Sequence, residues 1–212
     1  SKVYGSWSKW TINKSSSGTT IAASGGSGTV SAPTAIRTRS YTWNGTGTSY
    51  TEQGTGTPTL TKQSGDGSFS VSGTTATVSY GNNTTISSKS TVVRATMDTE
   101  YVDTTFTQSA GSKVYGSWSI WSVYCNASSF TVSASGGSVT IYSGASRSRS
   151  WTWNGVSGSG GTESESGTPT LSASGSGSLS GTTLSYGNNT STSSRTTRVT
   201  ATYGNYSDYC DI

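Results

Sequence analysis

Carboxylate side chains are the first residues of this 212-residue sequence that could do chemistry. Glu163 and Glu165 lie two residues apart, and Asp98, Glu100 and Asp103 form a second group. Glycoside hydrolysis needs two carboxyl groups that face each other across a sugar, and oxygen ligands can also hold calcium. Both groups lie in polar sequence with nothing to bury them. We therefore expect solvated charges, with calcium binding by the second group as the alternative.

The other catalytic residue types are scarce. The chain has no histidine, which removes the most common general base and metal ligand. No nucleophile-elbow, zinc-protease, phosphate-loop or dinucleotide-binding motif occurs. We therefore predict that the protein is not an enzyme and binds neither a cofactor nor a metal.

Alternating arginine and aromatic residues form another candidate group. Arg147, Arg149, Trp151 and Trp153 are spaced by two, so their side chains share one face of a strand, and residues 37–43 repeat the pattern. Such a face could bind a sugar ring or another planar ligand. The alternative, which we favour, is a structural strand whose tryptophans lie in the core and whose arginine stems pack on apolar surface.

These groups belong to a sequence that occurs twice. SKVYGSW at residues 1–7 returns at 112–118, and SYGNNT at 79–84 returns at 185–190. The order of the shared motifs is kept while their spacing shortens, as expected for two copies of one fold with different loop lengths. One repeating unit has about 105 to 110 residues, the usual size of an immunoglobulin-like domain.

Short strand signals alternate with Gly-Gly and Asn-Gly turn signals, and no segment shows a helical period. We predict an all-β chain of two tandem immunoglobulin-like β-sandwich domains, residues 1–105 and 112–212, joined by a flexible polar linker at 106–111. The strands predicted in the second copy are 118–124, 130–135, 138–143, 147–153, 169–173, 182–186 and 195–203.

Each predicted core is small, because only 29% of the residues are hydrophobic. Large aromatic rings should compensate for the scarce aliphatic residues. The tryptophans expected mostly in the core are Trp7, Trp10, Trp43, Trp118, Trp121 and Trp153. The aliphatic residues expected to point inward in the second copy are Val139, Ile141, Leu171, Leu184, Val199 and Ala201.

Charge and hydropathy exclude two classes of partner. The net charge is +4, but the 13 basic residues are scattered without a run of five, so no nucleic acid is expected. No stretch approaches the roughly 18 apolar residues of a membrane helix, so no membrane insertion is expected. No signal peptide is recognised, so a secreted protein would be a mature form, whereas a virion protein needs no such signal.

Two stretches of the second copy, ASGGSVTIYS (134–143) and SYGNNTSTSSRTTRVTATY (185–203), resemble bacterial immunoglobulin-like modules of the BACON type. Such modules occur in surface proteins of gut Bacteroidetes and in structural proteins of their tailed phages. The resemblance implies an immunoglobulin-like fold at a virion surface, or in an extracellular or cell-surface location. It carries over no ligand-binding residues.

Cys125 and Cys210 are the only cysteines, and two cysteines cannot make a zinc site alone. The first and last strands of an immunoglobulin-like sandwich can run side by side, which would bring the two sulfurs together. A disulfide there would contribute about 3–5 kcal/mol of stability. The sequence leaves the choice between a disulfide and two free thiols open.

The last ten residues, YGNYSDYCDI at 203–212, differ from the Ser- and Thr-rich remainder. They resemble antibody loops, in which tyrosine supplies contact area and small residues supply adaptable hydrogen bonds. Their residue types, like those of VYCNASSF at 123–130, can be reached from an asparagine codon by changing only its adenines. This resembles the variable regions made by diversity-generating retroelements; the alternative is an ordinary polar last strand with a frayed end. The predicted ligand-binding patch contains Tyr124, Asn126, Tyr203, Asn205, Tyr206, Asp208, Tyr209 and Asp211.

The sequence therefore favours a non-enzymatic phage virion or surface display protein. Its immunoglobulin-like domains would attach to a protein or glycan on a host cell through a hypervariable C-terminal patch, and other virion proteins could be partners. The alternatives are a bacterial cell-surface adhesin or spacer module, and an accessory carbohydrate-binding module of a larger enzyme.

Overall fold

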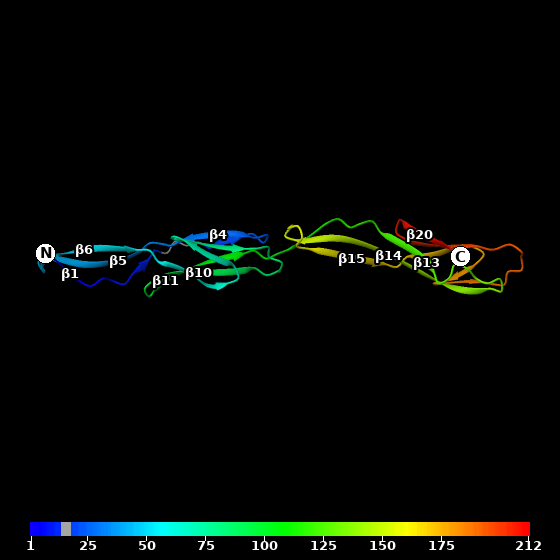
Figure 1. Cartoon of the computed structure of the whole chain (residues 1–212), viewed down its shortest axis with the longest axis horizontal. Coiled ribbons are helices and arrows are strands. Elements are labelled where there is room, and N and C mark those ends of the chain that lie inside the picture. The colour runs from blue at the N-terminus through cyan, green and yellow to red at the C-terminus, as the bar shows by residue number, and fades with distance from the viewer. Residues whose placement is uncertain (14–17) are drawn as a thin grey trace. The chain divides into compact units, whose positions relative to one another are not determined.

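The chain is all-β, as predicted. The computed structural model describes residues 1–13 and 18–212, and these residues form strands and connecting segments without a helix (Figure 1). They divide into two compact units: residues 1–114 with 152–159, and residues 115–151 with 160–212. The tip of one hairpin of the second copy, Thr152–Ser159, therefore belongs to the first unit.

The first copy contains three sheets. One sheet has the order β1 (Lys2–Tyr4), β5 (Ala35–Trp43) and β2 (Thr11–Ile12), with β6 (Thr46–Gly56) also pairing with β5. A second has the order β3 (Thr19–Ile21), β11 (Glu100–Gln108), β10 (Lys89–Met97) and β7 (Thr59–Gly65). The third has the order β4 (Gly26–Ser31), β9 (Thr75–Tyr80) and β8 (Ser68–Ser72).

The second copy is arranged around one long strand. The strands β12 (Lys113–Tyr115), β14 (Gly137–Trp153), β18 (Thr183–Tyr186) and β17 (Ser178–Ser180) lie in that order, and β13 (Ser122–Ala127) and β15 (Gly161–Gly167) also pair with β14. A separate sheet has the order β16 (Thr170–Gly175), β19 (Thr197–Tyr203) and β20 (Tyr206–Asp211).

Two of the predicted strands are merged and one is absent. The predictions at 138–143 and 147–153 are both parts of β14, which pairs in turn with β18, β13 and β15. The chain changes partner along its length without ending a strand, and sequence pattern alone does not distinguish these cases. Residues 130–135 form no strand, so that prediction is wrong.

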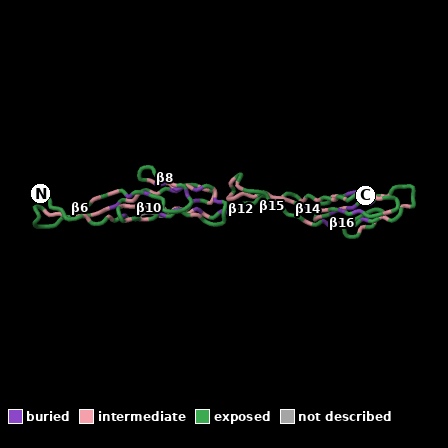
Figure 2. The backbone as a smooth tube through the Cα atoms, turned by 60° about the horizontal axis from the view of Figure 1, so that its bottom comes forward, coloured by how far each residue is buried: buried purple, intermediate pink, exposed green. Residues whose placement is uncertain are grey.

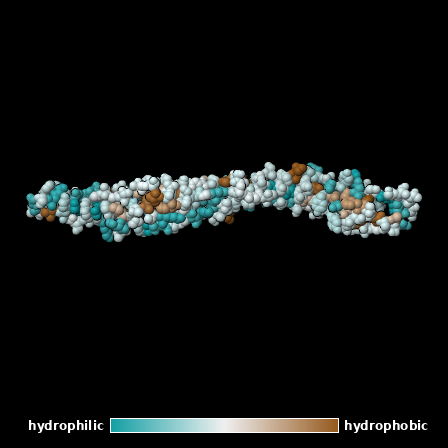
Figure 3. Space-filling view, viewed as in Figure 1, coloured by the Kyte–Doolittle hydropathy of each residue, from teal (hydrophilic) through white to brown (hydrophobic). Residues whose placement is uncertain are grey.

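The core of each copy is mostly aliphatic. In the first, it joins two sheets through buried residues that include Ile21, Leu60, Val78, Val93 and Phe106. In the second, the buried residues are Val139, Ile141, Leu184, Val199, Cys210 and Ile212, and Leu171 packs against them. Ala201 is buried as well. Figure 2 shows the buried stretches concentrated in these regions, and Figure 3 shows small hydrophobic patches on a mostly polar surface.

The prediction that tryptophans fill the core is wrong. Trp43 is 52% exposed. The other five tryptophans assigned to the core, Trp7, Trp10, Trp118, Trp121 and Trp153, are only half-buried. Four of these rings, Trp7, Trp10, Trp118 and Trp121, stack on arginine side chains that need access to water.

The tryptophans of the first copy alternate with arginines. The guanidinium carbon of Arg37 lies 4.6 Å from the ring centroid of Trp7 and 4.5 Å from that of Trp10. Arg39 lies between Tyr4 and Trp7, at 3.6 and 4.4 Å. We call this stack of arginine and aromatic side chains the ladder.

The second copy has the same ladder. Arg147 lies 4.8 Å from Trp118 and 4.6 Å from Trp121, and Arg149 lies 4.0 Å from Tyr115 and 4.5 Å from Trp118. Each such contact contributes on the order of 0.5–2 kcal/mol. The structural interpretation of the arginine and aromatic pattern therefore accounts for these contacts, although the rings lie beside the core and not in it.

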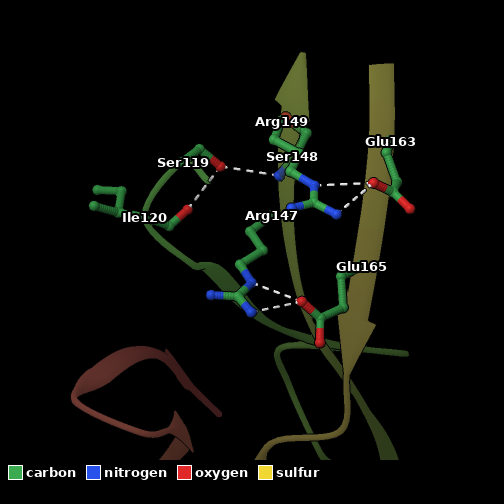
Figure 4. A network of polar contacts seen from close by, with 7 residues as sticks. All are labelled: Ser119, Ile120, Arg147, Ser148, Arg149, Glu163 and Glu165. Atoms are coloured by element: carbon green, nitrogen blue, oxygen red, sulfur yellow. Dashed lines mark hydrogen bonds and ion pairs between the residues drawn. The ribbon is translucent and has the colours of Figure 1, made fainter. Parts of the chain in front are cut away.

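A serine between the two tryptophans forms hydrogen bonds that join the ladder to the neighbouring strand. The Ser119 amide donates to the carbonyl of Ser148 at 2.7 Å, and the Ser148 amide donates back to Ser119 Oγ at 3.0 Å (Figure 4). Ser8 and Thr38 make the same pair of bonds in the first copy. The recurring Trp-Ser-x-Trp sequence is thus explained by one local structure.

The carboxylates that we expected to be solvated are ion-paired with the ladder. Glu165 lies 2.6 Å from Arg147, and Glu163 lies 2.8 Å from Arg149 (Figure 4). Pairing of β14 with β15 places each glutamate directly opposite its arginine. Both glutamate side chains are solvated as expected, at 47% and 45% exposed, but their arginine partners were missed because the two groups were considered separately.

The segment assigned to a flexible linker, 106–111, is partly in a strand and partly buried. β11 continues to Gln108, and Phe106 and Gln108 are fully buried. The Gln108 side-chain amide donates to the carbonyls of Ala22, Ala23 and Gly81. Phe106 completes the core of the first copy, so the chain cannot leave the sheet before it.

The recurring SYGNNT motif builds a loop. Asn83 is fully buried, and its side-chain amide donates to the carbonyls of Ser87 and Ser109 at 2.8 and 2.9 Å. Its carbonyl oxygen accepts from the amide and hydroxyl of Thr85. Asn189 makes the corresponding bonds to Ser193 and Ser191 in the second copy. The motif therefore has a structural role.

We predict that Trp118→Ala lowers the free energy of unfolding by about 2–3 kcal/mol, because it removes a half-buried ring that two arginines share. Urea unfolding of the full chain measures this change. The control is Ile120→Ala, two residues away and 74% exposed, which should change stability by less than about 0.5 kcal/mol. Equal effects of the two substitutions would show that the ladder contributes nothing.

Candidate binding surface

Three of the residues singled out in the second copy lie where β13 meets β20. The Sγ atoms of Cys125 and Cys210 are 2.7 Å apart, and both are free thiols. The Cys125 amide donates to Asp208 Oδ2 at 2.9 Å. Asp208 was predicted to bind a ligand, but its carboxylate accepts a hydrogen bond from a backbone amide of β13.

The local environment suppresses ionisation of Cys125. Burial raises the pKa of this thiol from its ordinary value of 9.0 to about 12, and the contact with Cys210 acts in the same direction. A protonated thiol is a poor nucleophile. The contact between the two cysteines is therefore better suited to a structural role than to a reactive one.

A group of exposed side chains lies on the outer face of β13 and β14. Asn126 is directly opposite Tyr142, and Tyr124 is opposite Gly144. The two tyrosines are 54% and 52% exposed. A Cβ atom on Gly144 would lie 2.6 Å from the Tyr124 ring, so the ring extends over a glycine that leaves it room. We call Tyr124, Asn126 and Tyr142 the tyrosine platform.

The predicted residues of β20 are organised by an arginine on β19. Arg198 donates to both carboxylate oxygens of Asp211, at 2.9 and 2.8 Å, and its guanidinium lies 3.8 Å from the ring centroid of Tyr209. The hydrogen bond from Arg198 lowers the pKa of Asp211. Asp211 already has a partner, and one face of Tyr209 is covered by Arg198.

The first copy contains the same combination. Arg94 donates to both carboxylate oxygens of Asp103, at 2.7 and 2.8 Å, and lies 3.7 Å from Tyr101. The pKa of Asp103 is lowered by this hydrogen bond. The two clusters indicate a way of stabilising an exposed hairpin and not a feature special to the C-terminus. Asp103, one of the carboxylates considered as a calcium ligand, is engaged by an arginine.

The remaining predicted site residues lie in different surroundings. Tyr203 is half-buried and packs on Trp121, with ring centroids 4.5 Å apart. Asn205 and Tyr206 lie at the β19–β20 turn and are exposed. No hydrogen bond, ion pair or ring contact among the described residues joins the tyrosine platform to Tyr209 or Asp211.

The predicted residues therefore have three local settings on neighbouring strands: an inner contact, a hairpin cluster and the tyrosine platform. Tyr142, Gly144 and Arg198 were missed. The strand alternation of VTIYSG gave a signal for Tyr142, because Val139 and Ile141 point inward and Tyr142 must point outward. The pairing of Asn126 with Tyr142 carries no such local signal.

Comparison with known proteins gives no identification: no family model, curated protein or solved structure matches the chain. Among residues 1–13 and 18–212, no group of three or more acidic or cysteine side chains could hold a metal ion. A search of the same residues for a helix long and apolar enough to cross a membrane found none.

We predict that oxidation joins Cys125 to Cys210, because their sulfur atoms are already in contact. Mass measurement without reductant should show the loss of two hydrogen atoms. The bond should add about 4–5 kcal/mol to the free energy of unfolding, since the cysteines are 85 residues apart. Cys210→Ser should remove the dependence of stability on reductant. A chain that retains two thiols after mild oxidation would contradict this prediction.

We also predict slow alkylation of Cys125 in the reduced, folded chain. A pKa of about 12 in place of 9.0 lowers the thiolate fraction at pH 8 by about a thousandfold. Peptide mapping after timed iodoacetamide treatment measures the rate, with the urea-unfolded chain as control. Equal rates in the folded and unfolded chains would be inconsistent with a half-buried, protonated thiol.

Proposed function

We propose that the chain is a non-enzymatic attachment and display protein whose second copy binds a glycan through the tyrosine platform. In this proposal each copy is an immunoglobulin-like β-sandwich, as facing sheets over one aliphatic core suggest. Such a framework holds surface residues in fixed positions without supplying reactive groups.

The observation that carries the proposal is the pair of exposed tyrosines beside an asparagine. Aromatic rings supply a flat apolar surface with a polar tip, and a side-chain amide supplies both hydrogen-bond donors and an acceptor. These are the groups that a sugar ring with its hydroxyls requires. Tyr124 and Tyr142 are stabilised on strands, so binding would cost little ordering of the protein.

The platform is present in one copy only. The first copy has Asn13, Ser31 and Thr34 at the positions of Tyr124, Tyr142 and Gly144. A framework repeated with different surface residues favours a binding role for the copy that differs. The chain would act on a virion surface, in keeping with its resemblance to BACON-type modules, and adenine-directed diversification of residues 123–130 and 203–212 would vary the platform and the neighbouring hairpin.

The test is a glycan array with the full chain, followed by titration of the best ligand. We expect Tyr124→Ala and Tyr142→Ala each to weaken binding about tenfold or more, since a central aromatic contact is worth about 1.4 kcal/mol or more. The matched control is Tyr101→Ala, which removes a 53% exposed tyrosine from the first copy. An array without signal, or equal losses for all three variants, would refute the proposed site.

A further inference from the structure

One ladder arginine lacks the carboxylate that its counterpart has. Arg147 faces Glu165 and donates to its Oε2 from Nε at 2.8 Å and from Nη2 at 2.6 Å. In the first copy, Arg37 faces Gly54 on β6. The Nε atom of Arg37 is buried and has no hydrogen-bond acceptor among the described residues.

Two aromatic rings pack on the Arg37 guanidinium, whose Nε donor has no acceptor among the described residues. The guanidinium carbon lies 4.6 Å from the ring centroid of Trp7 and 4.5 Å from that of Trp10. The guanidinium is planar, and its N–H donors point outward within that plane. Two adjacent donors of this kind suit an oxyanion such as a carboxylate. On Arg147, the Oε2 atom of Glu165 accepts from both Nε and Nη2.

Gly54 leaves the carboxylate position without a side chain. A Cβ atom there would lie 3.2 Å from the edge of the Trp7 ring and 3.5 Å from Cγ of Arg37. The edge of the Trp7 ring therefore lies next to the space that the side chain of a glutamate at position 54 would occupy. Because Nε is buried, a carboxylate from solvent requires the ring edge to move outward before it can reach that atom.

We propose that Arg37, held between Trp7 and Trp10 and opposite Gly54, is a binding site for the carboxylate group of an external ligand. The ligand takes the place that Glu165 occupies in the second copy and supplies the acceptor that Nε lacks. The site lies in the first copy and is independent of the tyrosine platform.

The experiment follows the arginine Nε–Hε resonances of the ¹⁵N-labelled full chain during titration with sodium acetate, with sodium chloride at equal ionic strength as the reference. We expect a saturable shift of the Arg37 resonance with a dissociation constant on the order of 10–100 mM, the range for one charge-assisted contact at a half-exposed site. The Arg39, Arg147 and Arg149 resonances should not follow it, because their carboxylates are in place.

Two reciprocal variants make the test specific. Gly54→Glu supplies an internal carboxylate and should abolish the acetate shift of Arg37. Glu165→Gly removes the internal carboxylate of the second copy and should create an acetate shift at Arg147 that the unmodified chain lacks. Repeating the titration with D-glucuronate distinguishes a simple carboxylate site, with equal affinities, from one that also contacts the sugar ring, with tighter binding.

The proposal is overturned if the Arg37 resonance responds to acetate and to chloride alike, or if its acetate shift persists unchanged in Gly54→Glu. Failure of Glu165→Gly to make Arg147 responsive would also overturn it, even if Gly54→Glu did not fold. None of these results bears on glycan binding by Tyr124 and Tyr142, so the two proposals can fail separately.

Discussion

A guanidinium group between two aromatic rings is the contact on which both ladder regions depend. Residues 37–43 and 147–153 contain no buried side chain, so the hydrophobic effect that stabilises an ordinary sheet is weak there. The arginine stems and the rings cover one another, and the charge remains near water. Opposing glutamates then hold three of the four guanidinium groups by their edges.

The aliphatic cores have a different role. They lie where two sheets face each other, and their residues are mostly aliphatic, with Phe106 and Tyr80 as aromatic members in the first copy. The chain therefore places its buried aliphatic residues in one part of each copy and its ladder tryptophans in another. This division explains how a sequence with 29% hydrophobic residues can order more than 200 residues.

The two copies keep one framework and differ at individual positions. Gly54 stands where the second copy has Glu165, and Thr34 stands where it has Gly144. Gly54 lies within β6 as Glu165 lies within β15, whereas Thr34 lies in the break between β4 and β5 at a point where β14 is continuous. Both proposed binding sites arise from such differences. The contact of Cys125 with Cys210 adds a local constraint, because it ties the strand that carries Tyr124 to the last strand.

The sequence by itself determined the all-β class, the repeat and the inward aliphatic residues, since strand alternation and turn residues are local signals. It also placed Tyr124 and Asn126 among the surface residues. Tertiary structure alone decided which charges were paired: Glu163 and Glu165 meet Arg149 and Arg147 only because β15 lies beside β14. Likewise, the sequence assigned Phe106 and Gln108 to a linker, and only the tertiary structure showed that both are buried and that Phe106 belongs to the core of the first copy. The physical reason is that strand pairing joins residues far apart in the chain, and their burial and charge depend on that partner.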